Sequence, residues 1–134
     1  MMHSPKRIIV TGASRGIGRA LVDTFQNLGH NVWALSRNID ELKHIKGIHA
    51  VSIDLSDEQQ ISDWVGSCGI NHFDVLINNA GMLINKPFTE TTTADFEAVY
   101  RVNIFGAAQL IRHLLPLLTV DSHILNISSM GGVN

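Results

Sequence analysis

A run of β-branched residues followed at once by three spaced glycines constrains the fold of this chain more than any other feature. The run is Arg7-Ile8-Ile9-Val10-Thr11, and the glycines are Gly12, Gly16 and Gly18. A strand that passes through a glycine turn into a helix lets backbone amides approach a phosphate, and the helix N-terminus directs its partial positive charge at the same point. The opening of the chain therefore predicts an α/β domain that binds a dinucleotide.

Composition excludes several other classes of protein. The 134 residues are 45% hydrophobic and 16% charged, which fits one domain with a core. The formal net charge is -2 and the basic residues are scattered, so the chain lacks the basic surface of a nucleic-acid or anionic-membrane binder. No stretch has the length of a signal peptide's apolar core or a membrane span. We expect a cytoplasmic protein with a small-molecule ligand and neither a nucleic-acid nor a membrane partner.

The histidines are not paired at the spacing typical of a metal site, and the chain has one cysteine. Cys68 is the single cysteine, and its place on the apolar face of an expected helix indicates a core residue in a reducing compartment. None of the seven histidines is three or four residues from another, and none adjoins the cysteine. The sequence therefore predicts no metal site.

Short β-branched runs alternate with helical patterns along the whole chain. This alternation is typical of repeated β-α-β units around a parallel sheet, and the nearly continuous hydrophobicity of the runs suits strands covered on both faces. The expected strands are Arg7–Thr11, Asn31–Ser36, Ile48–Ile53, Asp74–Asn78 and His123–Ser128. We predict one Rossmann-type, doubly wound α/β domain over residues 1–134, with strand order 3-2-1-4-5 and no strand after the fifth.

Four helices are expected between these strands. Capping-box spacing predicts helices that begin at Asn38, with Glu41 three residues on, and at Ser56, with Gln59 three residues on. The other two are expected over residues 17–28 and from Thr92 or Thr93 to about Leu115, near Pro116.

The spacing of the glycines indicates a family. Gly12-x-x-x-Gly16-x-Gly18 is neither the usual Gly-x-Gly-x-x-Gly fingerprint nor a P-loop. With Thr11 it resembles the Thr-Gly-x-x-x-Gly-x-Gly motif of the short-chain dehydrogenase/reductase family, whereas the epimerase-like group has Thr-Gly-x-x-Gly-x-x-Gly. A purely structural glycine turn is the alternative interpretation of this motif alone. The resemblance implies that a dinucleotide contacts Gly12, Ser14, Arg15, Gly16, Ile17 and Gly18.

The end of the second strand bears on the choice of cofactor. An acidic residue there would hold the 2′-hydroxyl of the adenosine ribose, but the chain has Ser36 and then Arg37. A 2′-phosphate could pair with Arg37, assisted by Arg15, at about 1.5–3 kcal/mol. We therefore predict NADP (NADPH) as the preferred cofactor, with NAD as the alternative. The competing interpretation is that Arg37 is a solvated arginine near a helix start.

Two further motifs match the family at the ends of later strands. The resemblance implies that Asp54 meets the adenine amino group and that Leu55 lines the adenine pocket, although Asp54 could also be a turn residue. The sequence Asn78-Asn79-Ala80-Gly81 is identical to the family's Asn-Asn-Ala-Gly motif. By resemblance Asn78 ties neighbouring strands together, and Asn79, Ala80 and Gly81 lie along the cofactor ribose.

Two further patterns resemble the catalytic motifs of this family. Val102-Asn103-x-x-Gly106 places an amide and a glycine on the face of the long helix expected to be buried, where both residue types disfavour a helix. By resemblance Asn103 holds a water in a proton relay, and the alternative is a core amide. Asn126-x-Ser128-Ser129-x-x-Gly132 matches the family motif in which Ser129 is the catalytic serine that binds the substrate oxygen.

The family's Tyr-x-x-x-Lys motif is not among these residues. Tyr100 is the single tyrosine, and position 104 is Ile104. The resemblance thus covers the amino-terminal part of an NADP-dependent oxidoreductase that acts on a carbonyl or alcohol substrate and assembles as a homodimer or homotetramer. We expect the 134 residues alone to be inactive.

Other functions for this chain are weighed against an oxidoreductase. The alternative function is a non-catalytic nucleotide-binding or regulatory module, if Asn134 is the true terminus. A methyltransferase is disfavoured by Arg37, because an acidic residue that binds the ribose would be needed at that position.

The apolar segment Ile124–Ile127 is expected at a sheet edge, where it would promote aggregation.

Overall fold

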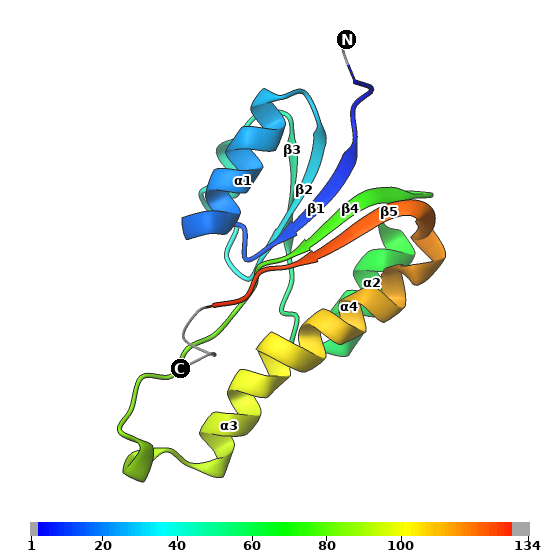
Figure 1. Cartoon of the computed structure of the whole chain (residues 1–134). Helices are drawn as coiled ribbons and strands as arrows, with labels where there is room; N and C mark the ends of the chain where they lie inside the picture. Colours follow the sequence, from blue (N-terminus) through cyan, green and yellow to red (C-terminus); the bar gives the residue numbers. More distant parts are fainter. Residues whose placement is uncertain (1–2, 130–134) are drawn as a thin grey trace.

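The computed structural model describes residues 3–129, which form a parallel five-stranded sheet with helices on both faces (Figure 1). The strand order is β3-β2-β1-β4-β5. The strands are β1 (Arg7–Thr11), β2 (Asn31–Ser36), β3 (Ile48–Ser52), β4 (Phe73–Asn78) and β5 (Leu118–Asn126). The predicted doubly wound class and the order 3-2-1-4-5 are confirmed.

The fifth strand differs most from its expected bounds. It begins at Leu118 and ends at Asn126, not at the expected 123–128. Its pairing with β4 shifts register between Phe73, opposite Leu118, and Val75, opposite His123, so β5 carries an irregular segment between those two partners. The Ser122 hydroxyl donates to the Phe73 carbonyl at 2.7 Å and thereby holds that segment against β4. Alternation of apolar residues could not reveal a strand interrupted in this way. The third strand is also one residue shorter than expected, and the fourth one residue longer.

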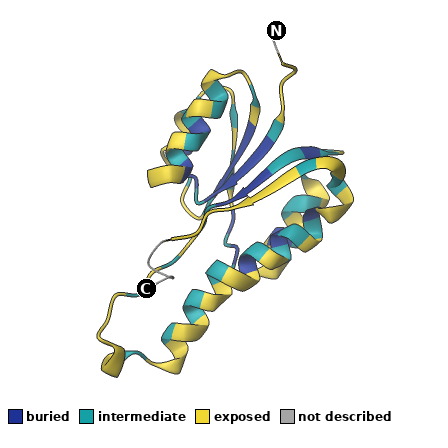
Figure 2. Ribbon diagram, in the orientation of Figure 1, coloured by how far each residue is buried: buried dark blue, intermediate teal, exposed yellow. Residues whose placement is uncertain are grey.

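Alternate side chains of the central strands enter two separate cores. On β1, Ile9 packs with residues of the helices on one face, whereas Ile8 and Val10 pack with α1 (Gly16–Asn27) on the other. All three side chains are almost fully buried. The burial of β1 and β2 on both faces, in dark blue in Figure 2, explains why their sequences are continuously hydrophobic.

The helix expected from Asn38 is wrong. Its place is taken by η1 (Leu42–His44), a single 3-10 turn. The Asn38 side chain accepts a hydrogen bond from the backbone of Asp40 at 2.8 Å, which forms an Asx turn instead of a capping box with Glu41. The local turn thus competes with helix formation at this point.

The helix expected from Ser56 exists but begins later. It is α2 (Glu58–Ser67), and its cap is Asp57, whose side chain accepts from the Gln59 amide at 3.0 Å. Ser56 instead donates to Asp54, which leaves it unable to cap the helix. Cys68 follows the helix and packs against the core, half-buried, as expected.

The long helix runs as expected from Thr93, capped by Thr92, but it is not uniform. It consists of α3 (Thr93–Tyr100), the π-helical segment η3 (Arg101–Gly106) and α4 (Ala107–Leu114), followed by the 3-10 turn η4 (Leu115–Leu117). Figure 1 shows α4 beneath the sheet beside α2, whereas α3 extends past the carboxyl ends of the strands. No residue of α3 is buried. Another turn, η2 (Phe88–Glu90), precedes α3.

Candidate functional site

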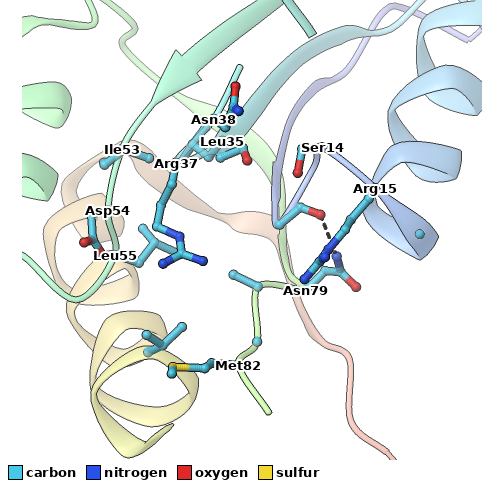
Figure 3. A pocket seen from close by; sticks show the side chains of 16 residues that line it. Ser14, Arg15, Leu35, Arg37, Asn38, Ile53, Asp54, Leu55, Asn79 and Met82 are labelled. Atoms are coloured by element: carbon cyan, nitrogen blue, oxygen red, sulfur yellow. Dashed lines mark hydrogen bonds between the residues drawn. The ribbon is translucent and has the colours of Figure 1, made fainter. Parts of the chain in front are cut away.

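A cavity of about 670 Å³ lies at the carboxyl ends of the strands, beside the turn that joins β1 to α1 (Figure 3). Chain connections leave β1 and β4 toward opposite faces of the sheet, which is where doubly wound folds bind ligands. The cavity is lined by Gly12, Ser14, Arg15, Gly16, Leu35, Ser36, Arg37, Asn38, Ile53, Asp54, Leu55, Asn79, Ala80, Gly81, Met82 and Val102. Its residues come from every strand end except that of β5.

The glycine turn is built so tightly that side chains are excluded from it. Gly12 has a φ of 61°, and a Cβ there would lie 2.8 Å from the Ala80 Cα. A Cβ on Gly18 would lie 2.1 Å from the Gly12 carbonyl oxygen and 2.5 Å from the side-chain nitrogen of Asn79. Gly18 therefore supports the turn from behind, and the face of the turn toward the cavity stays open to a ligand.

Hydrogen bonds fasten this turn to the segment that follows β4. The Asn79 side-chain amide donates to the carbonyls of Thr11 and Gly12, at 3.1 and 3.2 Å. The Thr11 hydroxyl accepts from the backbone amides of Asn79 and Ala80, at 3.0 and 2.9 Å, and donates weakly to the Ile77 carbonyl. The two family motifs thus form one rigid wall, in which Thr11 is the buried central residue.

The opposite wall carries Arg37 and Asp54. Asp54 accepts from the Ser56 hydroxyl at 2.7 Å and from its backbone amide at 2.9 Å. The hydroxyl bond most strongly lowers the pKa of Asp54; the amide bond and the charge of Arg37 act in the same direction, against partial burial. Figure 3 shows Arg37 reaching into the cavity from the end of β2, while Arg15 comes from the glycine turn. Neither arginine forms an ion pair with any residue in 3–129.

Asn103 lies behind the cavity and organises one of its edges. Its side-chain oxygen accepts from the Met82 amide at 2.7 Å, and its nitrogen donates to the Met82 carbonyl at 3.0 Å. One residue of η3 therefore satisfies both backbone groups of a residue that lines the cavity. One turn later, a Cβ on Gly106 would lie 2.8 Å from the Leu55 carbonyl oxygen, so glycine lets the long helix approach the segment that follows β3.

Ser129 is exposed and lies three residues beyond the end of β5, and it is not among the residues that line this cavity. The neighbouring strand ends are tied together as expected for Asn78. Its amide donates to the side chain of Asn126 at 3.0 Å, and its carbonyl accepts from the Ile127 amide at 3.0 Å. Gly132, the last position of the serine motif, lies outside the described residues.

Most of the residues expected at the cofactor site line the cavity. Among the expected contacts, Ile17 and Gly18 do not: the Ile17 side chain is 61% exposed and Gly18 lies behind the turn. The lining residues that the sequence reasoning missed are Leu35, Ser36, Asn38, Ile53, Met82 and Val102. Most of them flank one of the motifs or a strand end, so their position at the carboxyl edge of the sheet is the sequence signal that indicates them.

Two other kinds of site are absent from the described part of the chain. No three histidine, cysteine or acidic residues in this part gather closely enough to hold a metal ion. The helices of residues 3–129 include none with the length and apolarity needed to cross a bilayer.

Nearly the whole chain is similar to a family model and to curated proteins. A family model described as short chain dehydrogenase matches residues 6–134. Carbonyl reductase (NADPH) 2 of Sus scrofa is 33% identical over 137 residues, which cover 97% of this chain and 55% of that protein. L-xylulose reductase of Homo sapiens is 34% identical over 131 residues, 92% of this chain and 53% of that protein.

Solved structures show the same relationship. The NADPH-bound carbonyl reductase from chicken fatty liver superposes with a TM-score of 0.85 at 27% identity, over 96% of this chain and 61% of that one. A short-chain dehydrogenase from Streptomyces avermitilis has a TM-score of 0.82 at 34% identity, over 98% and 52%. The chain thus spans about half the length of the curated relatives described above.

Proposed function

The chain belongs to the short-chain dehydrogenase/reductase family of oxidoreductases, and from that premise we propose that its cavity binds NADP for hydride transfer to or from a small carbonyl or alcohol substrate. The observation that carries the proposal is Arg37, which enters the cavity at the end of β2, where no acidic residue precedes it. A carboxylate at that point would favour the ribose hydroxyl of NAD, whereas a guanidinium favours a phosphate on the same ribose.

The walls of the cavity support the proposal that a dinucleotide binds there. A volume of about 670 Å³ lies within the range of small-molecule sites. The turn from Gly12 to Gly16 exposes backbone at the start of α1, which suits a pyrophosphate. We assign the adenine to the space beside Asp54 and Leu55, and the adjoining riboses to Asn79, Ala80 and Gly81. Arg37 and Arg15 would hold the 2′-phosphate.

The bound cofactor would supply or accept a hydride at the substrate carbon. This chain's own residues contribute binding, orientation and part of the proton transfer. By family resemblance we assign Ser129 to the substrate oxygen and Asn103 to a proton relay. The Asn103 side chain is already paired with Met82, so its direct role is to position the segment that borders the cofactor.

Tyr100 does not supply the tyrosine and lysine pair that the family uses for proton transfer. Tyr100 is followed four residues later by Ile104, which cannot lower a phenol pKa as a lysine would. We propose that the family's tyrosine and lysine lie outside this sequence and that residues 1–134 alone bind cofactor without turnover. We also propose a cytoplasmic protein that functions as a homodimer or homotetramer.

Nucleotide titration tests the cofactor assignment. We expect the chain to bind NADPH about ten- to a hundredfold more tightly than NADH, because the phosphate forms charge-assisted bonds with Arg37. Arg37→Ala should remove most of this ratio by weakening NADPH alone. Lys46→Ala is a matched control, because Lys46 is an exposed cation that does not line the cavity. Equal NADPH preference in wild type and Arg37→Ala would refute the assignment.

A further inference from the structure

Two histidines bind the amino-terminal end of β1, at the edge of the sheet opposite the cavity. His30 lies in the connection before β2, and His72 lies in the connection before β4. Because β2 and β4 flank β1 in the strand order, the two rings reach the start of β1 from both sides. Each ring presents its Nδ1 atom to Lys6 or Arg7. Neither histidine lines the cofactor cavity.

The His72 ring accepts a hydrogen bond from a guanidinium. The Arg7 Nη1 atom lies 2.7 Å from the His72 Nδ1 atom, and it also donates to the Asn71 side-chain oxygen at 3.0 Å. A guanidinium nitrogen donates and never accepts, so the Nδ1 atom of His72 must carry a lone pair and no proton. The single proton of the neutral ring is therefore on Nε2, which lies 3.5 Å from the Asp74 carboxylate.

The backbone holds His30 in the same protonation state. The Lys6 amide, which can only donate, lies 3.1 Å from the His30 Nδ1 atom. The Lys6 carbonyl accepts from the Asn31 amide at 2.9 Å, so both backbone groups of Lys6 bind this connection. The ring of Phe25 on α1 lies 6.2 Å from the His30 ring, and His30 has no ion-pair partner among residues 3–129. The Nδ1 atom of His30 is thus also required as an acceptor.

Two charged groups face His72, and they act in opposite directions when a second proton arrives. Asp74 attracts a cationic ring, but the neutral ring already directs its Nε2 proton at that carboxylate. The second proton can go only to Nδ1, the atom in contact with Arg7. Protonation there ends the hydrogen bond and leaves two cations 2.7 Å apart, against 3.5 Å for the attractive contact. The shorter, repulsive contact decides, so the guanidinium must leave the ring.

We propose that His30 and His72 form a pH-sensitive latch on the amino-terminal end of β1, closed while both rings are neutral and opened when they are protonated. A free imidazole takes up its second proton near about pH 6.5. The bonds from Lys6 and Arg7 form only on folding and require neutral rings, so the folded state binds fewer protons than the unfolded chain in this range. Stability should therefore fall as the pH decreases from about 7.5 to about 5.5.

Asparagine is the discriminating substitution, because its side-chain oxygen can accept a hydrogen bond but does not titrate. Urea unfolding of the 134-residue chain at two pH values measures the folding equilibrium constant. At the higher pH, the double variant His30→Asn/His72→Asn should match wild type within about threefold. On acidification, the folding constant of wild type should fall about tenfold more than that of the double variant, because bonds to Lys6 and Arg7 are lost.

The variant His44→Asn is the matched control for loss of a titrating ring. His44 is exposed in η1 and has no ion-pair partner among residues 3–129, so its variant should follow the wild-type pH dependence. If His44→Asn resists acid as well as the double variant does, the effect belongs to any histidine of this chain and the latch is overturned.

Arg7→Met separates the effect of the guanidinium from that of the carboxylate. The backbone bond from residue 7 to Asp74, at 2.7 Å, does not use the Arg7 side chain, so the variant keeps that contact. With Arg7 replaced, Asp74 is the charged group left beside His72, and protonation of the ring should then stabilise the fold. On acidification, Arg7→Met should lose less stability than Arg7→Met/His72→Asn, the reverse of the order expected with Arg7 present.

Nitrogen NMR of wild type tests the closed latch without any substitution. At about pH 7.5 we expect both rings to carry their proton on Nε2, and a proton on Nδ1 of either ring would overturn the latch. Equal losses of stability by wild type and the double variant on acidification would overturn it too, as would an unchanged order in the Arg7→Met background. These measurements use no nucleotide, so their outcome is independent of the cofactor assignment.

Discussion

The three glycines of the turn differ in whether they line the cavity. Gly12, Gly16 and Gly18 were all predicted to touch the cofactor, but they do different things. Gly12 and Gly16 line the cavity with φ near 60°, whereas Gly18 faces away from it and abuts the Gly12 carbonyl. A spacing pattern identifies which positions must be glycine, but it does not distinguish a position that faces the ligand from one that supports it.

Gly18→Ala should destabilise the domain by about 1–3 kcal/mol, because the added methyl overlaps backbone that cannot rotate away. The displaced turn should also weaken nucleotide binding at least about tenfold, since phosphate contacts depend on backbone position. Urea unfolding and calorimetry measure the two effects. Gly66→Ala is the control: Gly66 lies in α2 with open space around its Cα, and alanine there should stabilise by up to about 1 kcal/mol. Wild-type stability in Gly18→Ala would contradict the steric argument.

Thr11 makes hydrogen bonds that a local sequence motif cannot predict. Thr11 precedes Gly12 in the glycine motif, and its hydroxyl accepts the hydrogen bonds from the amides of Asn79 and Ala80. Those partners are 68 and 69 positions away in the chain. Sequence spacing carries no direct record of contacts at that separation, so the bonding of the two motifs emerges only from the folded sheet.

At the scale of elements, strands in the sheet centre were predicted better than its helices. β1 and β2 have the expected bounds because burial on both faces leaves a continuous apolar run. The predicted start residues of helices were wrong where several polar side chains compete for the same backbone amides. Asp57, and not Ser56, caps α2 because Ser56 is held by Asp54, a residue two positions earlier. The π-helical segment η3 has no signature in apolar periodicity, which averages over its one extra residue per turn.

The start of α3 gives a prediction for pH dependence. Asp95 accepts from the Lys86 ammonium, and from the Thr92 amide as part of a capping box, which together lower its pKa to about 2. A carboxyl whose pKa is depressed by folding stabilises the fold above its ordinary value of 3.8, and the contribution disappears as the pH falls toward 2. Asp95→Asn should therefore melt at a lower temperature than wild type at pH 7, and the difference should shrink below pH 4.

Thermal unfolding followed by circular dichroism between pH 7 and pH 3 measures this difference. Glu90→Gln, in the turn before α3, should follow the wild-type curve, because the Glu90 side chain has no ion-pair partner among residues 3–129. A melting difference for Asp95→Asn that stays constant down to pH 3 would show that Lys86 and Thr92 do not hold a charged carboxylate.

For the whole molecule, the two faces of the sheet are not covered equally along its width. The helices α2 and α4 bury one face, and α1 buries the other over the central strands (Figure 1). In residues 3–129, β5 pairs with β4 on one side only. Figure 2 shows it largely exposed, and Leu125 and Ile127 are 49% and 40% exposed. The sequence predicted this edge from the apolar run Ile124–Ile127, and the structure shows that no described element covers it.

An apolar edge strand with unpaired backbone groups is a template for pairing with another chain. We expect the isolated 134-residue chain to self-associate as its concentration rises, through β5. Leu125→Lys should shift the onset of association to a severalfold higher concentration, because a charge on the strand would have to lose its water when a second chain docks. Sedimentation velocity over a concentration series measures the shift. Leu28→Lys is the control: Leu28 is 67% exposed and follows α1, which packs against β1 and β2 in the interior of the strand order, so this variant should associate as wild type does. If both variants associate at the same concentration, the contact between chains does not involve β5. The exposed apolar residues of α3 and η3 are then the surface to substitute, because Phe96, Tyr100 and Ile104 are each about half exposed.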